Sequence, residues 1–274
     1  MKSKNFKKDI NSDLRLKDFF ANIESKIKKS SNFKVVYSAN FGSYDSFKDL
    51  VFIEKDVDYI YFTDNPKIKS DLWQVILLDS KLFDSREMAR AFKHLPHFFL
   101  SQYNSSLWID AQIMINKSSV NHIFSFLNNN NDFICFKHSR RNRVYQEAMA
   151  CLRIGHESIY KIITQYISYR LEGFKDCEDL IESGVLARNH KKKNVSIFQE
   201  AWANEIFFKS IRDQLSFNYV ASKTNFAYSF FAEKMSDLFT LTSHDHYGVY
   251  KNGSFKIPIQ RRIYRIVNFL RGKK

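Results

Sequence analysis

The chain has 274 residues, 44% hydrophobic and 16% aromatic, which excludes a disordered or low-complexity protein and provides for one large domain with a core. Its three cysteines are too few for a disulfide framework, which favours a reducing compartment. No apolar run approaches the roughly 18 residues of a membrane span, and the N-terminal sequence lacks the apolar core of a signal peptide.

The net charge of +14 is concentrated at the two ends of the chain. Residues 1–34 carry a net +6, residues 255–274 a net +7, and residues 35–254 only +1. A protein that follows a nucleic-acid groove carries its basic residues on one face or stripe of the folded body. The distribution therefore argues against nucleic acid as the partner.

In chain order, residues 1–32 are polar and charged with helical spacing of their apolar residues, and they predict a leading helix or a loosely attached arm. Helical spacing returns at 85–100, where Pro96 is expected to bend or end the helix. Between these helices, buried-strand patterns that end in a Gly or an acid are found at 33–42, 57–64 and 72–79.

Strands and helices keep alternating in the second half of the chain. A strand at 105–115 runs into Asp110 and then resumes. Further strands are expected at 132–138 and 184–190, helices at 118–128, 143–155, 158–173 and (one or two) 196–222, and short aromatic strands at 225–254. This alternation predicts an α/β fold with a mainly parallel sheet flanked by helices, whose ligand lies at the carboxyl ends of the strands.

The C-terminal segment 255–274, FKIPIQRRIYRIVNFLRGKK, spaces apolar residues three or four apart among basic ones and contains no acid. Such a basic amphipathic helix is typical of segments that lie on an anionic membrane surface. A terminal helix packed on the domain, with a solvated basic face, fits the same pattern. We interpret the segment as a membrane-surface helix that follows a domain at 33–254.

Four features are expected at the strand ends: the turn after Tyr37, Asp64, Asp110 and His138. Asp110 directly follows a buried strand, where a carboxylate can hold Mg²⁺ or Mn²⁺ against the phosphates of a nucleotide. A turn or helix-capping Asp is the alternative. Asp64 could bind a base or ribose, or begin the turn in D-N-P.

Arg86, Arg90 and Lys93 stand at i, i+4 and i+7 and so share one helix face. Three cations at a helix that follows a strand suit a diphosphate, and a solvated basic stripe is the alternative. Tyr37 and Phe41, at the first strand end, could stack on a base or pack in the core. The sequence contains neither G-x-G-x-x-G nor a P-loop, so the site would be of another kind.

Two more clusters are candidates. Asp213 and Gln214 precede an apolar helix face and could border a sugar, or Asp213 could complement a helix dipole. The stretch S-H-D-H-Y-G-V-Y-K brings together His244, His246 and Lys251, and the H-x-H spacing suits a metal site or a surface loop. The cysteines lack the paired spacing of a zinc site.

Several stretches together resemble a glycosyltransferase-like domain family, first described as a domain of unknown function, of plant mucilage and turgor-related proteins and of bacterial capsule or lipopolysaccharide loci. The resemblance covers roughly residues 33–222. The matching stretches, in order, are VVYSANFGSYD, YIYFTD, REMARAFKHLPHFFL, YNSSLWIDAQI, FKHSRRNRVYQEA, LARNH, QEAWANEI and SIRDQLSF. The order of SLWID and RDQLSF is the specific part.

The resemblance implies a GT-A-type, Rossmann-like domain that binds a nucleotide sugar, with a UDP-sugar favoured, and Mn²⁺ or Mg²⁺. Asp110 takes the place of the metal-binding acid of the D-x-D motif, and Gln112 stands where a second acid would be. D-Q-L-S-F-N is similar to a D-Q-x-x-L-N element of retaining sugar transferases, which gives Asp213 and Gln214 a place at the acceptor and the reacting face.

The resemblance extends to H-Y-G-V-Y-K, which is similar to an H-x-x-G-x-x-K closing segment. His246 stands one residue too close to Gly248 for that spacing, so His244 or Asp245 could complete the metal site in its place, and Lys251 would contact the nucleotide sugar. The function that follows is a cytoplasmic glycosyltransferase at the inner face of the membrane. It would extend a capsule or lipopolysaccharide glycan or a lipid-linked acceptor. The alternative is a non-catalytic sugar-nucleotide or nucleic-acid binder.

Overall fold

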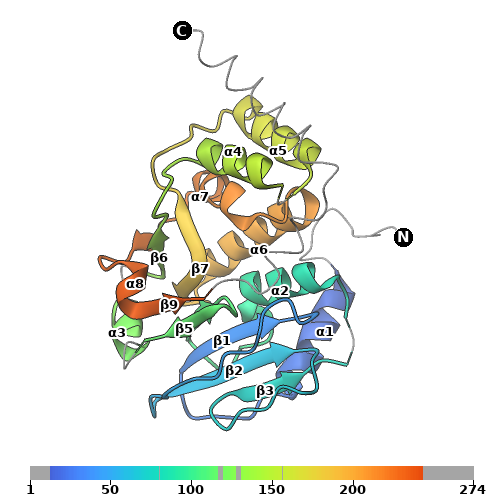
Figure 1. The fold of residues 1–274 in the computed structure, drawn as a ribbon, viewed down its shortest axis with the longest axis vertical. Coiled ribbons are helices and arrows are strands. Elements are labelled where there is room, and N and C mark those ends of the chain that lie inside the picture. The colour runs from blue at the N-terminus through green and yellow to red at the C-terminus, as the bar shows by residue number, and fades with distance from the viewer. Residues whose placement is uncertain (1–12, 80, 117–119, 128–130, 156, 243–274) are drawn as a thin grey trace.

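The computed structural model describes residues 13–79, 81–116, 120–127, 131–155 and 157–242, and its main sheet has seven strands in the order β3-β2-β1-β4-β7-β6-β8 (Figure 1). Long β-branched and aromatic runs form these strands because both faces of the sheet are covered. The strands are β1 (Lys34–Asn40), β2 (Val57–Thr63), β3 (Gln74–Leu77), β4 (Ser105–Ile109), β6 (Phe133–Lys137), β7 (Ile181–Arg188) and β8 (Ser229–Phe230).

Strand β1 pairs in parallel with β2 and β4, and β2 pairs in parallel with β3. Strand β7 runs antiparallel to both of its neighbours, β4 and β6, whereas β8 is parallel to β6. The expected α/β class with a mainly parallel sheet is confirmed. The direction of β7 was not expected, and it determines which end of that strand reaches the site.

The strand expected at 105–115 is two strands with a turn at Asp110. Strand β4 ends at Ile109, and β5 (Ile113–Ile115) leaves the main sheet to pair with β9 (Phe239–Leu241). The turn closes through a hydrogen bond from the Ile113 N–H to the Asp110 carbonyl at 2.8 Å. Asp110 therefore lies at the carboxyl edge of the sheet.

Helices cover the sheet on both faces, and alternate residues of β1 show this division. Val35 and Tyr37 face the larger core and Val36 the smaller one. The larger core is closed by α1 (Leu14–Ser25), α2 (Ser85–His94), α4 (Val144–Ile154), α5 (Ile159–Leu171), α6 (Lys193–Phe208) and α7 (Phe217–Thr224). The smaller core lies under α3 (Val120–Ser125), α8 (Met235–Leu238), β5 and β9.

The leading helix α1 packs on this domain along one apolar stripe. Leu16, Phe20 and Ile23 are buried at four- and three-residue spacing, and the Phe20 ring stacks on Phe99 at 4.9 Å between centroids. Asp13 caps the helix by accepting the Arg15 N–H. Of the two expectations for this region, a helix is what residues 14–25 form.

Pro96 ends α2 as expected, because α2 stops at His94 and a 3₁₀ turn, η2 (Pro96–Phe98), follows. The helix expected at 196–222 is α6, then a 3₁₀ turn η3 (Asp213–Leu215), then α7. In the described part of the chain no helix is long and apolar enough to cross a membrane. The segment 255–274 lies outside the described residues.

Candidate functional site

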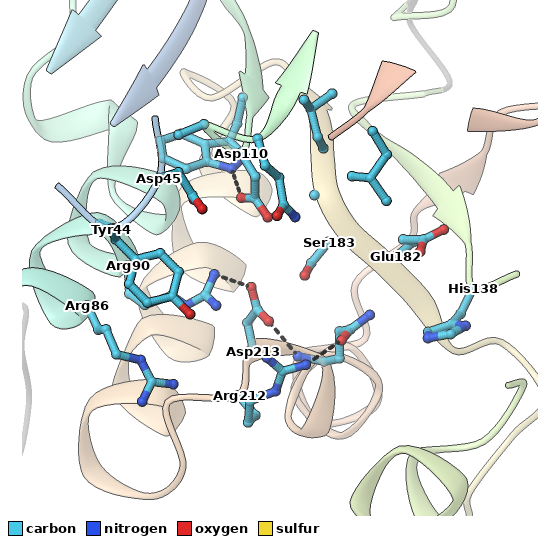
Figure 2. Close-up of a pocket in the computed structure, with 18 of the residues that line it drawn as sticks. Tyr44, Asp45, Arg86, Arg90, Asp110, His138, Glu182, Ser183, Arg212 and Asp213 are labelled. Atoms are coloured by element: carbon cyan, nitrogen blue, oxygen red, sulfur yellow. Dashed lines mark hydrogen bonds and ion pairs between the residues drawn. The ribbon is translucent and has the colours of Figure 1, made fainter. Parts of the chain in front are cut away.

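A pocket of about 810 Å³ opens at the carboxyl ends of β1, β4 and β6. Because β7 runs the other way, its first residues, Glu182 to Gly184, reach the same edge. Helices α2 and α4 and the turn η3 complete the wall (Figure 2). The site is where strand ends of an open α/β sheet are expected to hold a ligand.

A network of ion pairs between residues far apart in the sequence lies beneath one side of this pocket. The fully buried Lys93 donates to Asp110 Oδ1 at 3.1 Å and to Asp213 Oδ2 at 2.9 Å. Arg90 also donates to Asp213 Oδ2, at 2.9 Å. The sequence analysis named Arg90, Lys93, Asp110 and Asp213 as candidate site residues. The structure joins these four residues, from α2, the end of β4 and η3, in one network of ion pairs.

Asp213 is ionised at neutral pH. Burial alone would raise the pKa of this carboxyl, but the charges of Arg90 and Lys93 hold the pKa well below its usual value of 3.8. The adjacent His94 is buried, which lowers the pKa of its imidazole to about 3 and leaves the ring neutral. Asp213 Oδ1 accepts the Gln214 N–H at 3.0 Å. Asp213 is therefore an anion that holds the side chains of Arg90 and Lys93 in place.

Gln214 is fixed in the same turn. Its side-chain Nε2 donates to the Ile181 carbonyl at 3.0 Å, at the start of β7. Both Asp213 and Gln214 line the pocket, although each is less than a tenth exposed.

Asp110 presents one free carboxylate oxygen to the pocket. Its Oδ1 accepts from Lys93 and from Trp108 Nε1 at 2.7 Å, and the side chain is 28% exposed. Gln112 lines the same pocket, and its side-chain oxygen is buried with no hydrogen-bond partner among the described residues. Carboxylate and amide oxygens are ligands that Mg²⁺ and Mn²⁺ accept, with phosphates and water completing the shell. The residues present therefore fit a divalent cation.

The other expected metal ligands, His244 and His246, lie outside the described residues. Lys251, which was expected to contact the nucleotide sugar, lies outside them as well. Within the described ranges, no group of three or more His, Cys, Asp and Glu side chains could hold a metal ion.

Arg86 and Phe41 line the pocket, and Phe41 is also buried in the larger core, where its ring packs against Phe92 at 5.4 Å between centroids. The Arg86 guanidinium has no hydrogen bond or ion pair with another described side chain, and Figure 2 shows it beside Tyr44. The α2 cap explains its position, because Asp84 accepts the N–H groups of Arg86 and Glu87 and fixes the first turn. A free guanidinium at a pocket wall suits a phosphate.

Two expected binding residues have structural roles instead. Tyr37 is fully buried, and its ring packs edge-on against Trp108 while its hydroxyl accepts from Arg188. It cannot stack on a base from there, so the core alternative holds. Asp64 pairs with Lys81 and accepts the Gly42 N–H at 2.9 Å, and it is not among the residues that line the pocket. It anchors the turn after β1, where Gly42 has φ of 68°.

The wall opposite Arg86 carries charges that the sequence patterns missed. Glu147 on α4 is 2% exposed and accepts from Arg141 Nε at 2.6 Å and Arg212 Nη2 at 3.2 Å. Glu182 and His138 lie on this side in Figure 2. The strand-end rule pointed to His138, and the same rule points to Glu182 once β7 is known to be antiparallel.

Comparison with known proteins identifies the domain. A family model described as "TOD1/MUCI70, glycosyltransferase-like domain" matches residues 17–244. The "Probable hexosyltransferase MUCI70" of Arabidopsis thaliana is 28% identical over 179 residues, 60% of this chain and 31% of the relative, so the chain spans about a third of that protein's length.

A solved structure of WbbM, titled as a bifunctional glycosyltransferase in its apo form, superposes with a TM-score of 0.48 and 11% identity. The superposition covers 86% of this chain and 45% of the other. The family match covers most of the described residues, including every strand and helix that lines the pocket. The chain belongs to the TOD1/MUCI70 glycosyltransferase-like domain family.

Proposed function

We propose that this chain transfers a hexosyl residue from a nucleotide-sugar donor to a glycan or lipid-linked acceptor. The observation that carries the proposal is the cationic wall of the pocket, where Arg86 and Arg90 line the same cavity as the carboxylate of Asp110. Membership of a glycosyltransferase-like family and similarity to a probable hexosyltransferase support the reaction class.

The wall suits the leaving group of sugar transfer. When the bond between the sugar and the nucleoside diphosphate breaks, negative charge develops on the outer phosphate. Arg86 is free to approach that phosphate, whereas Arg90 and Lys93 are held in place by their ion pairs with Asp213. Fixed charges in a partly water-excluded pocket stabilise developing charge without rearranging.

A divalent cation fits the same wall. Asp110 and Gln112 would hold Mg²⁺ or Mn²⁺, which would neutralise diphosphate charge. The ion pair to Lys93 holds the Oδ1 oxygen of Asp110 in place.

The finer parts of the proposal come from the sequence. They are a UDP-sugar donor, a capsule or lipopolysaccharide acceptor, and attachment of 255–274 to the inner face of the membrane. The basic, acid-free composition of that segment supports the attachment. The D-Q-L-S-F-N resemblance implies retention of anomeric configuration, which the stereochemistry of the product tests.

Thermal unfolding with nucleotides tests the proposal. Wild type, Asp110→Ala and the exposed-acid control Asp71→Ala are melted with UDP, GDP, ADP or CDP, each with Mn²⁺ or with EDTA. A nucleotide at about 100 times its Kd should stabilise the wild type and the control by about 2.7 kcal/mol. Loss of the shift in Asp110→Ala and in EDTA supports a metal held by Asp110.

The remaining outcomes are also informative. An equal shift in EDTA assigns donor binding to the cationic wall alone. Binding without release of nucleoside diphosphate from the UDP-sugar favours a non-catalytic sugar-nucleotide binder. If no nucleotide shifts the melt, the proposed function is contradicted.

A further inference from the structure

The pocket has a second wall that donor binding does not require. It is formed by the loop after β6, by α4 and by the first residues of β7. Figure 2 shows Glu182 and His138 on this side, away from Tyr44 and Arg86, with Ser183 between the two walls. An acceptor that meets the sugar from the side opposite the diphosphate would lie against this second wall.

Glu182 differs from the other acids of the pocket in its lack of a partner. Asp110 and Asp213 face Lys93, and Glu147 faces Arg141 and Arg212. Asp45 lies on the loop after β1, on the side of the pocket that carries Tyr44 and Arg86. Glu182 lines the pocket, yet its carboxylate has no hydrogen bond or ion pair with any described residue.

The surroundings of Glu182 suit a proton acceptor. Burial raises the pKa of its carboxyl above the usual 4.5, although Arg141 and Arg140 on the loop after β6 act in the opposite direction. Glu147 on α4 adds a smaller upward effect. A carboxylate with a raised pKa takes up a proton more readily than an ordinary one.

The other titratable side chains on this wall are engaged. His138 Nδ1 accepts the N–H groups of Arg140 and Arg141 at 3.0 and 3.2 Å, and its Nε2 lies 2.8 Å from Arg141 Nη2. Burial raises the pKa of the Cys151 thiol to about 12, and its Sγ lies 3.3 Å from Glu147 Oε1. Neither group is available to accept a proton from a ligand.

Strand β7 brings Glu182 to the same pocket as Asp110. The Asp110 N–H donates to the Gly184 carbonyl at 2.8 Å, so Gly184 lies directly beside Asp110. Glu182 is two residues earlier on β7, where the pairing with β6 shifts register between Leu186 and Glu182. Gly184 leaves the intervening space open, because a Cβ there would lie 3.5 Å from Asp110 Oδ2 and 2.8 Å from Ile113 Cδ1.

We propose that Glu182 is the catalytic base that takes the proton of the acceptor hydroxyl. The acceptor oxygen bonds to the anomeric carbon, the bond from that carbon to the diphosphate oxygen breaks, and its electron pair leaves with the nucleoside diphosphate. The hydroxyl proton passes to the Glu182 carboxylate. Attack from the wall opposite the leaving group inverts the anomeric carbon, in contrast to the retention implied by D-Q-L-S-F-N. The proposal rests on the proposed function.

The test compares Glu182→Gln with Glu178→Gln, an exposed acid four residues earlier that does not line the pocket. UDP-glucose and UDP-galactose are the donors, p-nitrophenyl hexosides or water the acceptors, and UDP release gives turnover. Glu182→Gln should lower kcat about 10²- to 10⁴-fold, leave the UDP-induced melting shift unchanged, and remove the fall in kcat on the acid side of the pH profile. Glu178→Gln should match the wild type.

Product stereochemistry provides a second readout that a merely structural role would not affect. NMR of the first-formed product should show a configuration opposite to that of the donor. Turnover of Glu182→Gln within about threefold of wild type overturns the assignment of Glu182. A product with the same anomeric configuration as the donor overturns it as well. A wild-type chain that neither binds UDP nor releases it from the donor contradicts the proposed function instead, and the base with it.

Discussion

Lys93 shows how differently one residue is interpreted from sequence and from structure. Helical spacing grouped it with Arg86 and Arg90 as a diphosphate ligand. In the structure it is fully buried and forms ion pairs with both Asp110 and Asp213, which lie 103 positions apart in the sequence. Lys93 does not line the pocket itself, whereas Arg86 lines it at a position that a ligand can reach.

Removing this buried cation should be costly. Lys93→Met leaves Asp213 with Arg90 alone and Asp110 without a cation, so we expect a loss of about 3–5 kcal/mol in the free energy of unfolding. Denaturant unfolding measures the loss. Lys161→Met, an exposed helical ion pair with Glu157, should change stability by less than about 1 kcal/mol. Equal effects of the two substitutions would contradict the network.

The same network predicts an acid dependence of stability. Because the pKa of Asp213 is lower in the folded state than its ordinary 3.8, the ionised carboxylate contributes stability above pH 3.8, and this is lost as the pH falls below it. Unfolding free energies measured between about pH 2 and 7 should fall less steeply for Asp213→Asn than for wild type. Parallel curves would show that Asp213 does not take part in this loss.

Among the elements, α1 and β7 depend most on tertiary context. The apolar spacing of residues 14–25 predicts a helix, but whether that helix packs depends on an aromatic cluster from α2 and η2, where Phe20 meets Phe92 and Phe99. Strand β7 was expected at 184–190 and spans Ile181–Arg188, antiparallel to its neighbours. Periodicity identifies a strand but carries no information on its direction.

The packing of α1 can be measured with a matched pair on the same helix. Phe20→Ala removes a fully buried ring and should reduce the free energy of unfolding by about 3–5 kcal/mol. Leu14→Ala, at a side chain that is 72% exposed, should change it by less than about 0.5 kcal/mol. Similar melting temperatures for the two variants would mean that α1 contributes little to the stability of the domain.

At the scale of the whole molecule, the net charge of the body differs from that of the two ends of the chain. The body of the chain is nearly neutral and has at the pocket the Arg86 guanidinium, which pairs with no other described side chain, whereas the basic surplus lies in the terminal segments of the sequence. The pocket thus attracts a small anionic ligand without making the whole domain basic. Attachment to an anionic surface would depend on 255–274.

Vesicle co-sedimentation of the full chain tests that attachment. The wild type should bind vesicles that contain phosphatidylglycerol at low salt, release them as the salt concentration rises, and ignore pure phosphatidylcholine. Deletion of 255–274 should abolish the binding, with the nucleotide-induced melting shift intact. Binding that survives the deletion would contradict the role of this segment.

Sequence by itself determined the α/β class, the position of most strands and helices, and the carboxylate after the β4 strand. These depend on local periodicity and on the rule that parallel strand ends meet at one edge of a sheet. Only the tertiary structure decided that Tyr37 and Asp64 support the fold, that Lys93 bridges two carboxylates, and that Glu182 reaches the pocket. Burial, ion pairing and strand direction arise from contacts between segments far apart in the chain, which no local pattern encodes.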